Sequence, residues 1–256
     1  MDKKKKYLLI SLIVIILIIV FNVVYNNNSK KPNVKKDVAR IVKTVTDENL
    51  TYDDFTKLVG TDVANINIVT GPNSYLRNKP KEDIIKKYNL EKYVELQDEL
   101  ARRVEKRYVD NLKYKIMETQ NLDNKECHVI RITAYYYELY MHDLLNLINA
   151  QLDMDISEIV NDSKAQAEYL KKEVLALKVL DNHLDDYENK IQESSVIRLC
   201  YKNGKIESND MILSLVLAFR GNGYLNVDFS NEQNVKAAQA RLSKYLDELK
   251  KTKLFE

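Results

Sequence analysis

The residues whose spacing suggests chemistry are the two cysteines and the arginines near them. Cys127 opens a segment rich in β-branched and aromatic residues, and Cys200 lies near the end of a second such segment. If these segments pair as antiparallel strands, side-chain alternation puts both cysteines at the same end and on the same face of the sheet. The pattern permits a Cys127–Cys200 disulfide, and two buried free thiols are the alternative.

Arg131 and Tyr135 follow Cys127 at alternating positions, and Arg198 precedes Cys200 by two. The same alternation places these side chains on the sheet face that mixes polar and apolar residues. Arginine and tyrosine combine hydrogen-bonding groups with large apolar area, which suits a peptide or a glycan. The sequence therefore predicts a ligand face of Arg131, Tyr135 and Arg198, and tyrosines that pack under helices are the alternative.

Common signatures of catalytic, metal and cofactor sites are missing from the sequence. No G-x-S-x-G, H-E-x-x-H, phosphate-binding glycine loop or G-x-G-x-x-G motif occurs. The three histidines have no metal-binding spacing with another histidine or a cysteine, and the His183–Asp186 pair is interpreted as a solvated helix face. We therefore expect no catalytic residue, no metal ligand and no cofactor.

Composition and charge narrow the class of protein. Hydrophobic residues make up 45% of the 256 residues and charged residues 30%, with 5 Gly and 3 Pro, which favours an ordered, helix-rich chain. The formal net charge is +2, and four lysines, Lys3 to Lys6, lie in the N-terminal tail. The rest of the chain has no basic excess, so nucleic acid is not an expected partner.

One segment near the N-terminus is apolar enough to cross a membrane. Residues 8–24 read LLISLIVIILIIVFNVV, in which Ser11 and Asn22 are the polar residues. A helix from Tyr7 to Tyr25 would reach roughly 28 Å, close to the hydrocarbon thickness of a bilayer. No small-x-small cleavage site follows, so we expect a retained signal anchor. The basic tail at residues 1–6 predicts a cytoplasmic N-terminus and a domain outside the cell membrane.

After a polar linker at residues 26–33, the pattern predicts one extracytoplasmic domain at residues 34–256. Helical spacing marks residues 34–46, 81–108 with a break near Asn89, 140–152, a long segment at 156–190 that starts near Asp155, and a C-terminal helix at 231–250. Two hairpins, which include a strand at residues 127–137 and a turn at Asn203-Gly204, form a sheet core of about residues 111–209. The predicted fold class is α+β, predominantly helical, with a small antiparallel sheet packed against long amphipathic helices.

The apolar seam of the long segment has two interpretations. Its apolar residues fall mostly on alternating spacings of four and three between Ile156 and Ile191, with interruptions at Ser163, Asp181 and Glu188. A wide and interrupted stripe is more typical of packing within a domain than of a coiled coil. Self-association through residues 156–191 is the alternative.

Two blocks of sequence carry a resemblance to a known class of domain. YKIMETQNLDNKECHVIRITAYYYEL and VIRLCYKNGKIESNDMILSLVLAFRGN resemble the two hairpin blocks of cystatin-like, nuclear-transport-factor-like extracytoplasmic domains of bacterial membrane-attached proteins. The resemblance covers residues 81–221 at most and implies a binding or accessory module. The chain departs from that class because it has no Trp, has Ile206 where an aromatic residue is usual, and carries a large helical insertion from Ile156.

These observations together predict a membrane-anchored, non-catalytic binding or accessory module of the cell envelope. Its expected partners are the membrane and an envelope protein, peptide or glycan. The alternatives are a structural protein that self-associates through residues 156–191 and an envelope hydrolase. A hydrolase would require a deep pocket with two carboxylates, or with a histidine and a carboxylate within hydrogen-bond reach.

Overall fold

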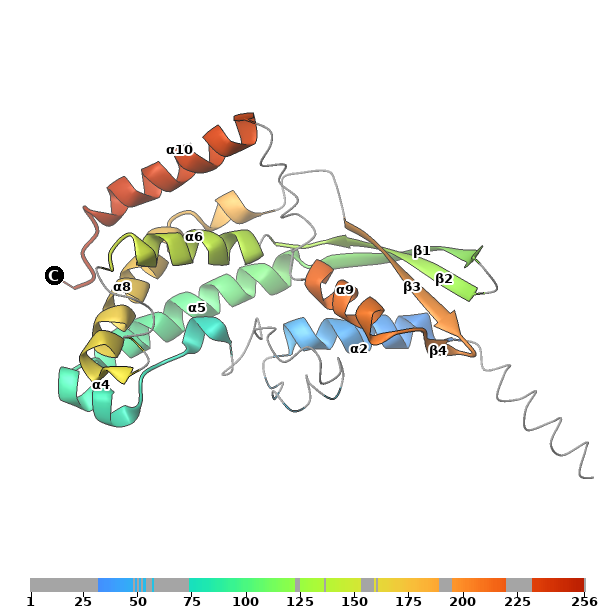
Figure 1. Cartoon of the computed structure of the whole chain (residues 1–256), viewed down its shortest axis with the longest axis horizontal. Coiled ribbons are helices and arrows are strands. Elements are labelled where there is room, and N and C mark those ends of the chain that lie inside the picture. The colour runs from blue at the N-terminus through green and yellow to red at the C-terminus, as the bar shows by residue number, and fades with distance from the viewer. Residues whose placement is uncertain are drawn as a thin grey trace, which may run out of the picture.

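A computed structural model describes residues 32–47, 49, 51, 53, 57, 74–122, 125–135, 137–152, 159, 161–188, 195–219 and 232–255. These residues form mostly helices and a four-stranded antiparallel sheet in the order β1-β2-β3-β4. Figure 1 shows the sheet at one end of the molecule and a group of helices at the other end. The predicted α+β, predominantly helical class is confirmed.

The sheet is built from two hairpins, as the sequence predicts. β1 (Lys113–Leu122) pairs with β2 (Lys125–Thr133), and β3 (Ser195–Lys202) pairs with the short β4 (Lys205–Ile206). The second hairpin turns at Asn203 and Gly204, whose φ angles of 53° and 72° are those of a type I′ turn. β2 and β3 pair in the centre, which joins hairpins that are distant in the sequence.

Two helices lie against the sheet. α2 (Val34–Thr46) and α9 (Asn209–Phe219) contact each other below the strands in Figure 1, and α9 contacts β3. The Tyr201 hydroxyl on β3 donates a hydrogen bond to Asp37 Oδ2 on α2 over 3.0 Å, which ties this helix to the sheet. Apolar residues of α2 that recur at spacings of four and three are buried: Val34, Val38, Ile41 and Val45.

The other end of the molecule is organised around α8 (Ser163–Asp181). This helix contacts α4 (Glu82–Tyr88), α5 (Glu91–Asn111), α6 (Tyr137–Asn149) and α10 (Glu232–Leu249). Short 3₁₀ helices lie beside the group, η2 (Tyr75–Arg77) and η3 (Leu184–Tyr187). Of the apolar residues that would form a self-association seam, those that the structure describes are buried within the domain: Ala167, Leu170, Val174, Leu177 and Leu184.

Several predicted boundaries match the structure closely. The break predicted near Asn89 separates α4 from α5, and Asn89 adopts the left-handed conformation with φ of 53°. The C-terminal helix predicted at residues 231–250 corresponds to α10. Local sequence signals therefore locate the break between α4 and α5 and the position of α10.

The strand predicted at residues 127–137 is shorter in the structure. β2 ends at Thr133, and α6 begins at Tyr137 instead of at the predicted Tyr140. The buried side chains of α6 have helical spacing, and their burial outweighs the β propensity of consecutive tyrosines. These side chains are Tyr137, Tyr140, Met141, Leu144, Leu147 and Ile148.

The prediction of one long helix at residues 156–190 is wrong in its extent. Asp162 has an extended backbone, and its side chain accepts a hydrogen bond from the Lys164 amide over 2.9 Å, so α8 starts at this point. At the other end α8 stops at Asp181, and η3 follows. The start predicted at Asp155 lies outside the described residues.

The predicted anchor at Tyr7–Tyr25, the tail before it and most of the linker after it also lie outside the described residues. In the part of the chain that the structure describes, no helix combines the length and apolar character needed to span a bilayer. The membrane anchor therefore stays a prediction from the sequence.

Candidate functional site

Two of the three residues of the predicted ligand face lie together on the sheet. Arg131 on β2 lies opposite Val196, and Arg198 on β3 lies opposite Val129. Residues directly opposite each other on antiparallel strands share a face, so the arginines are diagonal neighbours on one face. Both arginines are exposed.

The arginines lie in a hollow of about 700 Å³. Met117, Glu118 and Gln120 line it from β1, and Met211 and Ser214 line it from α9. Glu118 is the single carboxylate of this lining. Within the described residues, neither arginine has an ion-pair partner. The hollow therefore offers two guanidinium groups beside apolar side chains.

Two lysines extend the positive charge of this surface. Lys113 and Lys115 on β1 lie opposite Thr133 and Arg131, so they share a face with the arginines, and both are exposed. We call Lys113, Lys115, Arg131 and Arg198 the basic face. Like charges on adjacent strands repel each other, so the basic face gains stability from an anion.

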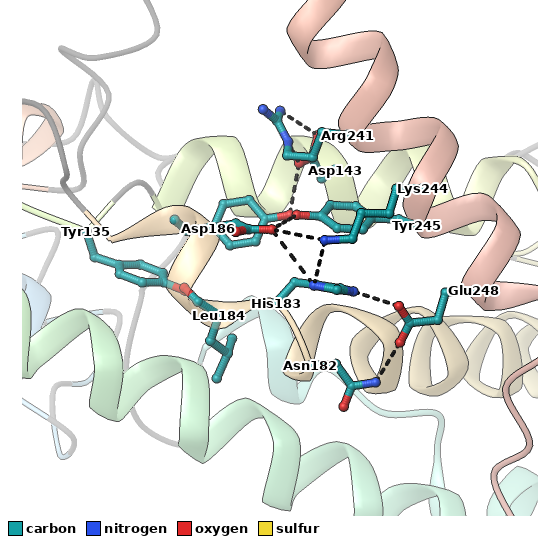
Figure 2. A network of polar contacts seen from close by, with 11 residues as sticks. Tyr135, Asp143, Asn182, His183, Leu184, Asp186, Arg241, Lys244, Tyr245 and Glu248 are labelled. Atoms are coloured by element: carbon teal, nitrogen blue, oxygen red, sulfur yellow. Dashed lines mark hydrogen bonds and ion pairs between the residues drawn. The ribbon is translucent and has the colours of Figure 1, made fainter.

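Tyr135, the third residue of the predicted ligand face, does not lie on it. β2 ends at Thr133, and Tyr135 turns into the core, where it is fully buried. Its hydroxyl donates a hydrogen bond to the Leu184 carbonyl over 2.9 Å, as Figure 2 shows. Burial is the main cause that raises the pKa of Tyr135 well above its usual 10. Tyr135 is therefore a core residue and the prediction for it is wrong.

The predicted cysteine pair is joined by a disulfide. Cys127 and Cys200 lie directly opposite each other on β2 and β3, with Cα atoms 4.0 Å apart. Both are buried, with exposed fractions of 1% and 7%. The disulfide links the two central strands at one end of the face that carries Arg131 and Arg198.

A second cavity, of about 500 Å³, lies between α6, α8 and the segment that joins η2 to α4. No sequence motif predicts it. Its lining combines aromatic, basic, amide, apolar and acidic side chains: Tyr75, Asn78, Lys79, Pro80, Lys81, Leu145, Asn149, Ile159, Gln166, Tyr169, Leu170 and Glu173. A cavity of this size with a few polar groups is typical of small-ligand sites.

Glu173 is the buried acid of this cavity, with an exposed fraction of 3%. Its Oε2 accepts a hydrogen bond from Gln97 Nε2 over 3.0 Å, and the same Nε2 donates to the Asn78 carbonyl over 2.9 Å. Burial, opposed in part by the Gln97 hydrogen bond, raises the pKa of Glu173 to about 8. The carboxyl group is therefore mostly protonated at neutral pH.

Sequence reasoning missed Glu173, although a signal for it was present. Glu173 follows Leu170 by three positions and precedes Leu177 by four, so the helical period places it on the apolar stripe of α8. Glutamate is rarely buried unless a partner or a function compensates. An acidic residue inside a predicted apolar stripe therefore marks a candidate site.

His183 and Asp186, interpreted from the sequence as a solvated helix face, belong to a polar network (Figure 2). His183 Nε2 lies 2.7 Å from Glu248 Oε2, and His183 Nδ1 lies 3.8 Å from Asp186 Oδ2. The His183 side chain is only 14% exposed, and its ring stacks on Tyr245 with centroids 4.7 Å apart. Since Tyr245 and Glu248 belong to α10, this network holds α10 against η3.

The arrangement expected of a hydrolase is not present in either cavity. Each lining contains one carboxylate and no histidine among its described residues. The pair of His183 and Glu248 belongs to neither lining. In the described part of the chain, no group of three or more His, Cys, Asp or Glu side chains has the geometry to hold a metal ion. A third hollow, of about 360 Å³, contains two carboxylates, Glu105 and Asp110, which pair with Arg77 and Lys106.

Comparisons of this chain with protein families, with curated proteins and with solved structures find no match. The resemblance to cystatin-like domains therefore stays a prediction from two sequence blocks. The basic face and the cavity at Glu173 remain as the features from which function can be inferred.

Proposed function

We propose that this chain is a membrane-anchored, extracytoplasmic and non-catalytic binding module, and that its basic face binds an acidic segment of a protein partner. The observation that carries the proposal is the pair Arg131 and Arg198, exposed in one hollow without a carboxylate partner among the described residues. A guanidinium group binds carboxylates through two parallel hydrogen bonds, so two adjacent arginines favour a ligand with several carboxylates.

The apolar part of the hollow favours a peptide as the acidic ligand. Val129 and Val196 lie opposite the arginines on the same face, and the Val196 residue is 54% exposed. Met211 adds a flexible apolar side chain at the α9 side. A peptide that alternates acidic and uncharged residues matches this combination of charges and apolar surface.

The backbone of β3 supplies a second reason for a peptide. The Cys200 carbonyl accepts a hydrogen bond from the Glu207 amide over 3.0 Å, so its backbone groups point away from β2. Because direction alternates with a period of two, the backbone groups of Arg198 and Val196 point to the same side. In the described part of the sheet, β4 pairs with β3 only at Tyr201 and Lys202. The Cys200 amide donates to Met211 Sδ of α9 over 3.4 Å, so α9 occupies this edge at Cys200, and an extended peptide would add as a further strand at Val196 and Arg198.

The proposed location rests on two observations. The apolar segment Tyr7–Tyr25 has the length of a membrane span. The disulfide between Cys127 and Cys200 is typical of an oxidising compartment, which supports a domain outside the cytoplasm. A module held at the membrane surface in this way would recruit an acidic partner to the envelope.

Fluorescence anisotropy on the full chain in detergent micelles tests the proposal. The probe is a labelled peptide of alternating Glu and Thr, and the matched control peptide alternates Lys and Thr. We expect the acidic peptide to bind, with affinity that falls as salt rises, because exposed charges are screened. Binding of neither peptide, or equal binding of both, would overturn the proposal.

A double variant then locates the site. We expect R131Q/R198Q to weaken binding of the acidic peptide by about tenfold for each arginine, because each substitution removes a charge-assisted hydrogen bond. The matched control is R40Q/R102Q, which removes two exposed arginines on α2 and α5. Equal loss in both double variants would assign the binding to net charge and contradict a specific basic face.

A further inference from the structure

The lining of the cavity between α6 and α8 contains one acid and two cations. Glu173 is almost fully buried in the lining, and Gln97 holds one of its carboxyl oxygens in place. The structure describes no partner for the other oxygen. Lys79 and Lys81, from the segment that precedes α4, are exposed members of the same lining. They form no ion pair with any residue that the structure describes.

Aromatic and apolar groups lie around the buried acid. Tyr169 is half-buried on α8, and burial raises the pKa of its hydroxyl well above the usual 10; Tyr75 lines the same cavity. Leu145 and Leu170 complete the apolar part of the lining. Electron-rich tyrosine rings attract cations, so these walls favour a positively charged ligand group near Glu173.

We propose that this cavity binds a small zwitterion, of the class of short peptides and ω-amino acids, with its ammonium group at Glu173 and its carboxylate at Lys79 and Lys81. The site is separate from the basic face and does not rest on the proposed function. Its ligand is one molecule of low mass, because the cavity volume is about 500 Å³.

The two kinds of charged group in the lining, Glu173 and the lysines, decide the class of ligand. A buried carboxylate is costly without a partner, and a bound ammonium group supplies both opposite charge and hydrogen bonds. A simple amine would satisfy Glu173 but would meet the positive potential of Lys79 and Lys81. A simple carboxylate would satisfy the lysines but would give Glu173 no cation. A molecule that carries both groups supplies a partner to Glu173 and to the lysines, which is how such a site would discriminate.

Binding in this manner moves one proton. The empty cavity holds Glu173 as a neutral carboxyl group at neutral pH, since burial raises its pKa to about 8. An incoming ammonium group already carries its charge, so the Glu173 carboxyl must give its proton to the solvent as the ion pair forms. Close to one proton per ligand is therefore released near pH 7.

Isothermal titration calorimetry on the full chain in detergent micelles tests the proposal. The probes are triglycine and 6-aminohexanoate, and hexylamine and hexanoate serve as controls that each lack one charged group. We expect both zwitterions to bind at least about tenfold more tightly than the controls. Titrations in two buffers with different ionisation enthalpies should report the release of about one proton. Failure of both zwitterions to bind, or binding without proton release, would overturn the proposal.

Variants that keep the fold test which residues form the site. Glu173→Gln keeps the shape of the protonated acid, so the folded domain should persist and circular dichroism should be unchanged. We expect E173Q to lose zwitterion binding by more than about tenfold, whereas E168Q, on the exposed side of α8, should bind as the wild type does. Equal binding by E173Q and wild type would contradict the assignment.

A separate variant tests the role of the two lysines. K79Q/K81Q should bind 6-aminohexanoate and hexylamine with similar affinity, because the lysine charges that select the ligand carboxylate are removed. R131Q/R198Q should leave zwitterion binding unchanged, which separates this site from the basic face. Retained preference for 6-aminohexanoate in K79Q/K81Q would refute the role of the two lysines.

Discussion

Arg241 Nε on α10 lies 2.8 Å from Asp143 Oδ2 on α6, and this ion pair joins the C-terminal helix to the rest of the domain. Asp143 is only 2% exposed, and it also accepts a hydrogen bond from the Tyr187 hydroxyl over 2.9 Å. Figure 2 shows the pair beside the network of His183 and Glu248. Since a buried carboxylate needs a compensating cation, α10 depends on Arg241 for its position.

Arg241→Met tests this dependence. The substitution keeps part of the apolar side chain but leaves the Asp143 charge without its cation, so we expect a loss of roughly 2–3 kcal/mol in the free energy of unfolding. The control is Lys244→Met on the same helix, where a side chain that is 58% exposed lies 3.9 Å from Asp186. It should cost less than about 0.5 kcal/mol. Equal losses in urea unfolding of the two variants would contradict the structural role of Arg241.

The buried acid of the cavity predicts a pH dependence of stability. The pKa of Glu173 is about 8 in the folded protein and about 4.5 when the chain is unfolded, so the folded state holds a proton that the unfolded state loses in this interval. The free energy of unfolding should therefore fall as pH rises from about 4.5 to 8, by up to about 1.4 kcal/mol per pH unit. Glu173→Gln should remove this slope. Parallel urea titrations of the two proteins check it, and identical pH dependence would refute the raised pKa.

The disulfide predicts a large effect on stability. Cys127 and Cys200 are separated by 73 residues, and a cross-link over such a loop restricts the unfolded chain by roughly 4 kcal/mol. C127A/C200A should therefore unfold at lower urea concentration than the oxidised wild type. Reductant should lower the stability of the wild type toward that of the variant, and it should leave the variant unchanged. A wild type that is insensitive to reductant under denaturing conditions would exclude the bridge.

Tyr135 and the arginines are expected to respond in opposite ways. Tyr135→Phe removes the hydroxyl that donates to the Leu184 carbonyl in the core, so it should lower the free energy of unfolding by about 1 kcal/mol. It should leave binding of the acidic peptide unchanged, because Tyr135 does not reach the basic face. R131Q/R198Q should weaken peptide binding with little effect on stability. A change of peptide affinity in Y135F would return Tyr135 to the ligand face.

The different outcomes for Arg131 and Tyr135 show what the sequence could predict. Strand alternation is a local property, so the sequence alone places Arg131, Arg198 and the two cysteines on one face correctly. The end of β2 is not local, because burial of the α6 side chains decides where the strand gives way to a helix. Tyr135 lies just beyond that end. Its spacing from Arg131 therefore does not predict which way its side chain points.

The cavity at Glu173 shows the other limit of prediction from sequence. Its walls come from α6, α8 and the segment that joins η2 to α4, which are distant in the sequence and meet only when the helices pack. The period of α8 marks Glu173 as buried, but it does not identify Lys79 or Tyr75 as its neighbours. A single buried acid can be found from the sequence, whereas the chemistry around it requires the fold.

The predicted anchor can be tested with two single-cysteine proteins in the C127S/C200S background. Lys253→Cys places a thiol at an exposed position after α10, and Lys3→Cys places one in the tail before the apolar segment. If Tyr7–Tyr25 spans the membrane with the N-terminus inside, a membrane-impermeant maleimide should label K253C on intact cells and K3C only after lysis. Lysis should also leave the full chain in the membrane pellet at high salt, because an apolar helix is not released by screening. The reverse labelling pattern would place the domain in the cytoplasm, where a disulfide between Cys127 and Cys200 would not persist.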